Sequence, residues 1–162
     1  MKTEIVSIFI CPTKGDEDGA HHRMVALEYV EALTGLGLAG DRYALGVGAY
    51  SKNNPEKRQV SFIAIEAIEE SNKLLEAPFE PKETRRNIVL KGIDVNSLVG
   101  KTFQIGSVIF EGTELCDPCH RPSKLVDKPG FKDAYDNRGG LRARVIKGGM
   151  VTVGEMTLKV LN

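Results

Sequence analysis

The sequence predicts a mainly β fold, an antiparallel barrel-like sheet with one or two short helices, in a single domain over residues 1–162. The first observation behind this prediction is the second half of the chain, where short apolar runs recur at regular spacing with glycine turns between them. Hairpins at such spacing are typical of a closed or nearly closed antiparallel barrel. The second observation is that only one segment has a clear helical stripe. The third is the length, which suits one domain with a sizeable core.

The predicted strands are short runs of apolar and β-branched residues. They are Ile5–Ile10, Gln59–Ile63, Ile88–Leu90, Thr102–Ile105, Val108–Leu115, Leu141–Ile146, Val151–Val153 and Met156–Leu161. Glycine turns at Gly106, Gly148 and Gly154 predict hairpins among the last five strands. Met24–Leu33 fits neither the helical nor the strand period, so no element is assigned to it.

The clear helix is expected to follow the strand that ends at Ile63. Its apolar stripe consists of Ile65, Ile68, Leu74 and Leu75. Pro78 and Pro81 end it, because proline removes a backbone donor. A single turn is expected at Asn96–Gly100, and a further short helix after Cys119.

Two polar, glycine-containing segments indicate loops. They are Cys11–Arg23, which carries His21 and His22, and Gly46–Pro55. Neither shows the periodicity of a regular element.

The composition argues against several classes of partner. Twenty-two basic and 22 acidic residues give zero formal net charge, so no dominant attraction to nucleic acid or to an anionic membrane is expected. No run of apolar residues is long enough to span a membrane. The N-terminal residues do not have the pattern of a signal peptide. Together with an odd number of cysteines, three, this predicts a cytoplasmic protein with free thiols.

The segment most indicative of chemistry is Cys116-Asp117-Pro118-Cys119-His120, directly after a predicted strand. Taken alone it fits several sites. It matches covalent attachment of c-type haem, but that chemistry belongs to exported proteins. It is half of a zinc site that Cys11 or a histidine would have to complete. A thioredoxin-like redox pair expects a βαβ pattern, which this chain is not expected to contain. Two small packed thiols are the fourth alternative.

Several arginines lie near glycine-rich backbone and strand ends. They are Arg42, Arg58, Arg85, Arg86, Arg138, Arg142 and Arg144. Guanidinium groups gathered by a fold can bind phosphate, although any single arginine is more often a surface residue. Asp41 is interpreted as an ion-pair partner of a nearby arginine. Gly35-x-Gly37-x-x-Gly40 has neither a firm strand before it nor a helix after it, so a dinucleotide fingerprint is rejected.

Six segments, taken in order, resemble the MOSC domain, the family named after the C-terminal part of molybdenum cofactor sulfurase. They are Gly37–Tyr43, Arg58–Ser61, Arg85–Ile88, Leu98–Gly106, Cys116–Cys119 and Arg138–Val145. The last of these is similar to the short stand-alone members. Each segment alone is weak, whereas the ordered set is fairly specific and extends over about residues 5–160.

The resemblance implies a β-barrel-like fold with a cleft for the molybdenum cofactor, a molybdenum-bound pterin (molybdopterin). Carried over by position, Cys119 would ligate the metal through its thiolate, with Cys116 as its neighbour. Arg42, Arg58 and Arg86 would hold the pterin phosphate, with Asn87 also at the cofactor site. The residue types suit this, because molybdenum accepts a soft thiolate and phosphate binds guanidinium groups.

Three functions follow from the resemblance. The first is an oxidoreductase that cycles Mo(IV) and Mo(VI) to reduce N-hydroxylated or similar small substrates. The chain is not expected to carry the N-terminal β-barrel extension of larger reductases, an aminotransferase-like domain, or an iron–sulfur or flavin motif, so a separate electron donor would be needed. The second is a persulfide sulfur carrier served by a cysteine desulfurase-type sulfur donor, and the third is a non-catalytic molybdenum cofactor carrier. In all three, Cys119→Ala is expected to matter more than Cys116→Ala.

Overall fold

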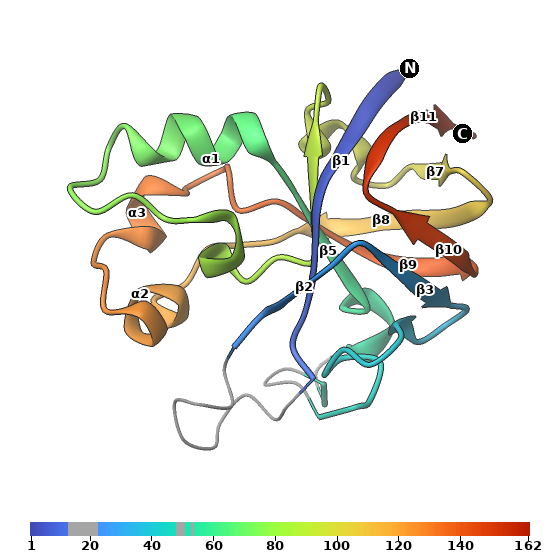
Figure 1. Cartoon of the computed structure of the whole chain (residues 1–162), viewed down its shortest axis with the longest axis horizontal. Helices are drawn as coiled ribbons and strands as arrows, with labels where there is room; N and C mark the ends of the chain where they lie inside the picture. Colours follow the sequence, from blue (N-terminus) through green and yellow to red (C-terminus); the bar gives the residue numbers. More distant parts are fainter. Residues whose placement is uncertain (13–22, 48–50, 53) are drawn as a thin grey trace.

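A closed barrel of seven strands forms the centre of the computed structural model, which describes residues 1–12, 23–47, 51–52 and 54–162 (Figure 1). In chain order the barrel strands are β1 (Lys2–Ile10), β5 (Val60–Ala64), β6 (Ile88–Lys91), β7 (Thr102–Ile105), β8 (Val108–Leu115), β9 (Leu141–Lys147) and β11 (Gly154–Val160). Around the barrel the order is β1-β6-β5-β9-β8-β7-β11, and β11 pairs back with β1 to close the ring. The mainly β fold class is therefore confirmed.

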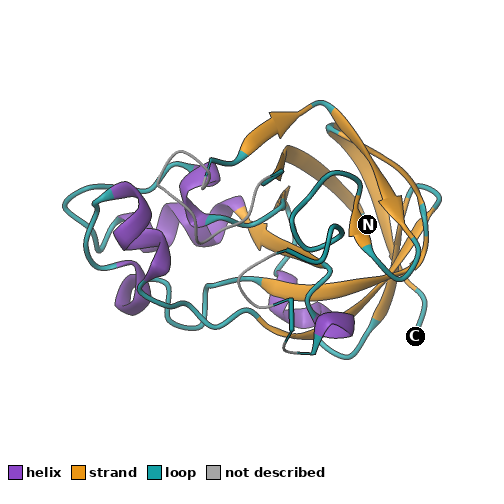
Figure 2. Cartoon of the chain, turned by 90° about the horizontal axis from the view of Figure 1, so that it is seen from below, coloured by secondary structure: helices purple, strands orange, loops and turns teal. Residues whose placement is uncertain are grey.

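The remaining elements attach to this barrel. Strand β2 (Val25–Leu27) pairs with β1, and a second sheet of three strands contains β3 (Tyr29–Leu33), β4 (Gly37–Leu38) and β10 (Gly149–Thr152). The helices are α1 (Ile65–Asn72), α2 (Arg121–Val126) and α3 (Phe131–Ala134). They lie together on one side of the barrel, at the left in Figures 1 and 2. Short 3-10 turns occupy Pro55–Lys57, Pro81–Thr84 and Val95–Leu98.

The core has two parts. Inside the barrel, the ring of Phe62 meets those of Phe103 and Phe110 at centroid distances of 5.6 and 5.1 Å. Between the barrel and the helices, Phe131 stacks on Tyr135 with centroids 4.2 Å apart. Strands β1, β5 and β6 contribute to both parts, so both of their faces are buried. This explains the uninterrupted apolar runs in these strands, Ile8–Ile10, Phe62–Ala64 and Ile88–Leu90.

Each predicted strand is present, and the hairpin at Gly106 joins β7 to β8. The hairpins predicted at Gly148 and Gly154 are wrong. Strand β10 pairs with β3, whereas β11 pairs with β1 and β7. The partner of β10 comes from Met24–Leu33, the segment to which no element was assigned.

The expectation that the chain has no βαβ pattern is wrong. Strands β5 and β6 are parallel neighbours, and helix α1 connects them. A parallel pair needs a crossover connection, which the predicted strand–helix–strand sequence supplies. The cysteine pair nevertheless lies outside this unit, at the end of β8.

The helices differ from prediction in their ends and number. Helix α1 ends at Asn72, so Leu74 and Leu75 lie beyond it. The side chain of Asn72, the last helical residue, bonds both backbone groups of Phe79, at 2.9 Å each. The expected helix after Cys119 is α2, and α3 was not predicted.

Part of the predicted loops, including His21 and His22, lies outside the described residues. In the part of the chain that the structure describes, none of the helices has the length and apolarity needed to cross a membrane.

Candidate functional site

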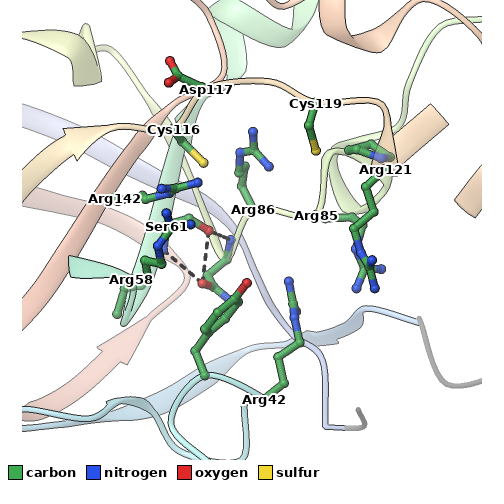
Figure 3. A pocket seen from close by; sticks show the side chains of 14 residues that line it. Arg42, Arg58, Ser61, Arg85, Arg86, Cys116, Asp117, Cys119, Arg121 and Arg142 are labelled. Atoms are coloured by element: carbon green, nitrogen blue, oxygen red, sulfur yellow. Dashed lines mark hydrogen bonds between the residues drawn. The ribbon is translucent and has the colours of Figure 1, made fainter. Parts of the chain in front are cut away.

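A pocket lies where β8 ends, between the strands β5 and β6 and the start of α2. Fourteen of the described residues line it, among them six arginines and two cysteines (Figure 3). The arginines are Arg42, Arg58, Arg85, Arg86, Arg121 and Arg142, and the cysteines are Cys116 and Cys119.

The fold brings together every residue that the sequence suggested for the cofactor site. Cys119, Arg42, Arg58, Arg86 and Asn87 all line this pocket, although they come from four separate segments of the chain. Their roles there stay predictions.

Other arginines behave differently from expectation. Arg138 lines a separate cavity beside α1, and Arg144 pairs with Glu111 at 3.1 Å. Arg121 lines the site but was missed by sequence reasoning. Its position immediately after the cysteine motif, at the first residue of α2, is the signal that could have indicated it.

The segment Gly139-Gly140 packs against the backbone of the cysteine loop, Cys116–Cys119. The Cys116 amide donates to the Gly140 carbonyl at 2.8 Å. A Cβ on Gly139 would lie 2.1 Å from the Cys116 carbonyl oxygen, and one on Gly140, whose φ is +99°, would lie 2.1 Å from the Phe62 carbonyl oxygen. Only glycine fits such close backbone approaches. The close backbone contacts of Gly139 and Gly140 therefore determine where the cysteine loop lies.

Both thiols of the motif face the pocket. Figure 3 shows the sulfurs of Cys116 and Cys119 pointing into it, whereas the Asp117 carboxylate points away. Cys116 is buried, with 7% of its surface exposed, and Cys119 is partly exposed. None of the three cysteines, all of which lie in the described part of the chain, forms a disulfide.

Arg142 and Cys116 both line the pocket, and their side chains lie near each other in Figure 3. On its other side, Arg142 Nη1 donates to Glu114 Oε1 at 3.1 Å. Burial disfavours the charge of Arg142, but Cys116 and Glu114 together outweigh it and raise the pKa of Arg142 above its ordinary value. The guanidinium is thus held in its charged form between a sulfur and a carboxylate.

Asp41 is a fully buried hydrogen-bond centre under the pocket, and not merely an ion-pair partner. Its Oδ1 accepts from the Cys11 amide at 2.8 Å and from Asn87 Nδ2 at 3.4 Å, and its Oδ2 accepts from the Tyr43 amide at 3.3 Å. The predicted pairing with an arginine is present as well, because Arg42 Nη1 lies 3.8 Å away. Arg42 also lies over the Tyr43 ring, 4.9 Å from its centroid.

Asn87 joins two strands beneath the arginines. Its Oδ1 accepts from the Ser61 amide at 3.0 Å and from the Ser61 hydroxyl at 3.1 Å. Its Nδ2 donates to the Phe9 carbonyl at 3.0 Å. The amide therefore connects β1 to β5, and it is 4% exposed.

Arg85 and Arg86 are consecutive, and their side chains make contacts in different parts of the site. Arg85 has a left-handed backbone, with φ of 66°, and its Nη2 lies 3.7 Å from the sulfur of Cys11. Burial, helped by the nearby charge of Arg42, lowers the pKa of Arg85 to about 10. Arg86 donates from Nε to the Gly139 carbonyl at 2.7 Å and from Nη1 to the Thr84 carbonyl at 3.1 Å. One of its nitrogens thus bonds the Gly139 segment that packs against the cysteine loop, and another bonds the backbone just before Arg86 itself.

The site combines soft sulfur donors with planar cationic groups. Thiolates bind soft metals, and guanidinium groups bind oxyanions such as phosphate in a bidentate manner. Among the residues that the structure describes, no three or more histidine, cysteine or acidic side chains gather as a metal site. The arrangement suits a ligand that brings both a metal and an anionic group.

Comparison with known proteins places this chain in a family. The MOSC domain model matches residues 39–157. The chain resembles the YuaD protein from Bacillus subtilis with a TM-score of 0.79 and 20% identity, over 100% of this chain and 98% of that one. It also resembles YiiM from Geobacillus stearothermophilus, with a TM-score of 0.69, 17% identity and coverage of 99% and 75%. For YiiM from Escherichia coli the TM-score is 0.65 and the identity is 16%, over 100% of this chain and 70% of that one.

A search of the curated proteins found no match. At the identities above, the structural likeness supports the fold alone, and this fold agrees with the family match. Because the family match extends over well over half of the chain, the protein belongs to the MOSC domain family.

Proposed function

We propose that this protein binds the molybdenum cofactor in the arginine-lined pocket, with the Cys119 thiolate as the protein's metal ligand. The observation that carries the proposal is the partly exposed Cys119 sulfur, which faces a pocket lined by six arginines. Membership of a family named after molybdenum cofactor sulfurase supports it.

The chemistry of the donor set fits such a ligand. Molybdenum accepts a soft thiolate, and a pterin phosphate is an oxyanion that guanidinium groups bind. Arg42 and Arg58 would hold the phosphate, since two nitrogens of Arg86 already bond backbone carbonyls. The role of Arg86 would then be to hold Gly139, while Asn87 fixes the floor of the pocket.

When bound, the cofactor would supply a two-electron redox centre. Cys119 would anchor and orient it at the pocket mouth, and the arginines would hold its anionic end. The activity we favour is the reduction of N-hydroxylated or similar small substrates, with electrons delivered by a separate donor protein. Because Cys116 is buried and Cys119 is partly exposed, substrate would approach the pocket from the Cys119 side only.

The test is to produce the full chain with and without molybdate and to measure molybdenum content and pterin fluorescence. The wild type should contain pterin and about one molybdenum per chain. Cys119→Ala should lose molybdenum and keep some pterin, whereas Arg42→Met should lose pterin. Arg144→Met is the matched control, because that arginine pairs with Glu111 away from the pocket. A metal-free wild type that also refuses added cofactor would contradict the proposal.

A second candidate, a persulfide sulfur carrier, is favoured by the partial exposure of Cys119 among arginines. The Cys119 thiolate would attack the outer sulfur of a persulfide on a cysteine desulfurase. A bond forms between that sulfur and Cys119 Sγ, its bond to the donor cysteine breaks, and the donor leaves as a thiolate.

Two measurements separate these functions. Persulfide labelling at Cys119 after incubation with a desulfurase would identify the carrier. Reductase assays with hydroxylamine-type substrates and an artificial electron donor would distinguish an enzyme from a non-catalytic cofactor carrier, which would bind cofactor without turnover.

A further inference from the structure

Strand β10 has one edge without a partner strand. Its sheet runs in the order β10-β3-β4, and among the described residues no strand pairs with the other edge of β10. The strand lies on the side of the barrel opposite the helices (Figure 1). An unpaired edge presents backbone N–H and C=O groups to which another strand can bond. Charged residues and proline usually prevent such pairing, and β10 contains neither.

The pairing of β10 with β3 shows which backbone groups point toward the open edge. The Val153 amide donates to the Glu28 carbonyl at 2.9 Å, so Val153 bonds toward β3. Because this direction alternates along an antiparallel strand, Val151 also bonds toward β3. The N–H and C=O groups of Met150 and Thr152 therefore point the other way. Both residues are exposed, Met150 to 52% of its surface.

The strand is complementary to a second copy of itself. When two copies of β10 lie antiparallel with their Val151 residues opposite each other, Met150 of each copy is opposite Thr152 of the other. These are the two residues whose backbone groups point toward the open edge. Each such pair can exchange two N–H···O=C bonds, and the two-fold symmetry provides the pair twice. The register thus uses every outward backbone group of Met150 and Thr152.

The flanking residues match in the same register. Gly148 of one copy is opposite Gly154 of the other, so no side chain obstructs the approach beyond the ends of the strand. Lys147 is opposite Glu155, and both residues are exposed. Opposite charges that face each other across an antiparallel pair stabilise it. Moving the centre by one residue in either direction from Val151 separates these charges, so charge complementarity selects this register.

We propose that the protein forms a symmetric dimer in which the β10 edges of two copies pair antiparallel about Val151. The two three-stranded sheets then join into one sheet of six strands. Tyr29, which is 63% exposed, is opposite Thr152 in the register of β3 and β10. Pairing of β10 with a second copy adds Met150 of that copy to the same cross-strand row, where a long side chain can cover part of the tyrosine.

The dimer and the arginine-lined pocket use different parts of the molecule. None of the fourteen described residues that line the pocket belongs to β3 or β10. The inference therefore does not rest on the proposed cofactor function. Because β10 is short, the interface is smaller than that of a standard stable complex, and we expect a reversible dimer with a Kd on the order of micromolar.

Sedimentation velocity on the full chain, from about 1 μM to about 1 mM, measures this association. The wild type should change from monomer to dimer over this range. Met150→Pro removes an N–H that points away from β3, and proline is tolerated at such edge positions. This variant should remain folded by circular dichroism and monomeric throughout. A wild type that stays monomeric at the highest concentration would overturn the dimer, and a folded Met150→Pro variant that still dimerises would overturn pairing through this edge.

A charge exchange tests the register independently of the proline variant. Lys147→Glu and Glu155→Lys should each raise the Kd about tenfold, because each places like charges opposite each other at two symmetric positions. The double variant exchanges the two charges and should recover the wild-type Kd. Lys159→Glu is the matched control, since it makes the same change in net charge at an exposed residue outside the paired segment. Equal effects of Lys147→Glu and Lys159→Glu, or no recovery in the double variant, would overturn the register.

Discussion

Replacing Asp41 with asparagine tests whether this carboxylate holds the floor of the pocket. The substitution keeps the shape of the side chain but removes its charge and one acceptor oxygen, and it turns an amide NH2 toward backbone donors. Within the described part of the chain, three N–H groups donate to this carboxylate, from Cys11 at 2.8 Å, Tyr43 at 3.3 Å and Asn87 at 3.4 Å. The side chain is fully buried, so water cannot replace the lost bonds.

The expected loss follows from these distances. Hydrogen bonds to a charged acceptor contribute roughly 1.5–3 kcal/mol each, but only the Cys11 bond is short and such values do not add. We therefore expect the free energy of unfolding to fall by about 3 kcal/mol, which for a chain of this size lowers Tm by roughly 10 °C.

Urea unfolding followed by circular dichroism measures this change, with Glu70→Gln as control. Glu70 is an exposed carboxylate that pairs with Lys73 on the surface, and its loss should leave the midpoint unchanged. A fall of less than about 1 kcal/mol for Asp41→Asn would refute the role assigned to this carboxylate, because one charged hydrogen bond alone should exceed it.

Two further predictions concern the glycine turn and the second core. Gly140→Ala should destabilise the protein by about 1–3 kcal/mol more than Gly106→Ala in urea unfolding, because both have positive φ but only the Gly140 Cβ would meet backbone. Equal losses would show that the contact with the Phe62 carbonyl relaxes freely. Burial raises the pKa of Tyr135 well above its usual range, so above a pH of about 10 the unfolded chain releases this proton while the native state keeps it. Stability should therefore fall with rising pH more steeply in the wild type than in Tyr135→Phe, and parallel curves would contradict the assignment.

The sequence predicted the strands well because their signals are local. Runs such as Val108–Leu115 carry their apolar pattern within themselves, and the glycine turn at Gly106 brings the neighbouring strand back beside it. Partner choice is not local. Strand β10 pairs with β3, which lies more than one hundred residues earlier in the chain. Neither segment carries a sequence signal that identifies the other as its partner.

In the candidate site, too, the sequence indicated the residue types but not the contacts that depend on the fold. Residue types and order indicated Cys119 and the arginines that the fold gathers around it. Asp41 was interpreted as an ion-pair partner because Arg42 is its neighbour in sequence, while its closest hydrogen-bond donor is the amide of the distant Cys11. The contact of Arg86 with Gly139 likewise depends on where the Gly139 carbonyl lies in the fold. The sequence does not indicate the position of a backbone carbonyl.

Arg85 lowers the stability of the folded protein in two ways. Outside glycine, a left-handed backbone costs roughly 1–2 kcal/mol, and the buried guanidinium is further disfavoured by its surroundings, as its lowered pKa indicates. Glycine at this position would relieve both penalties. Selection of this protein for heat resistance alone should therefore favour changes at Arg85, and variants improved in that way should have a less basic pocket. Thermal tolerance and ligand affinity would then move in opposite directions at one residue.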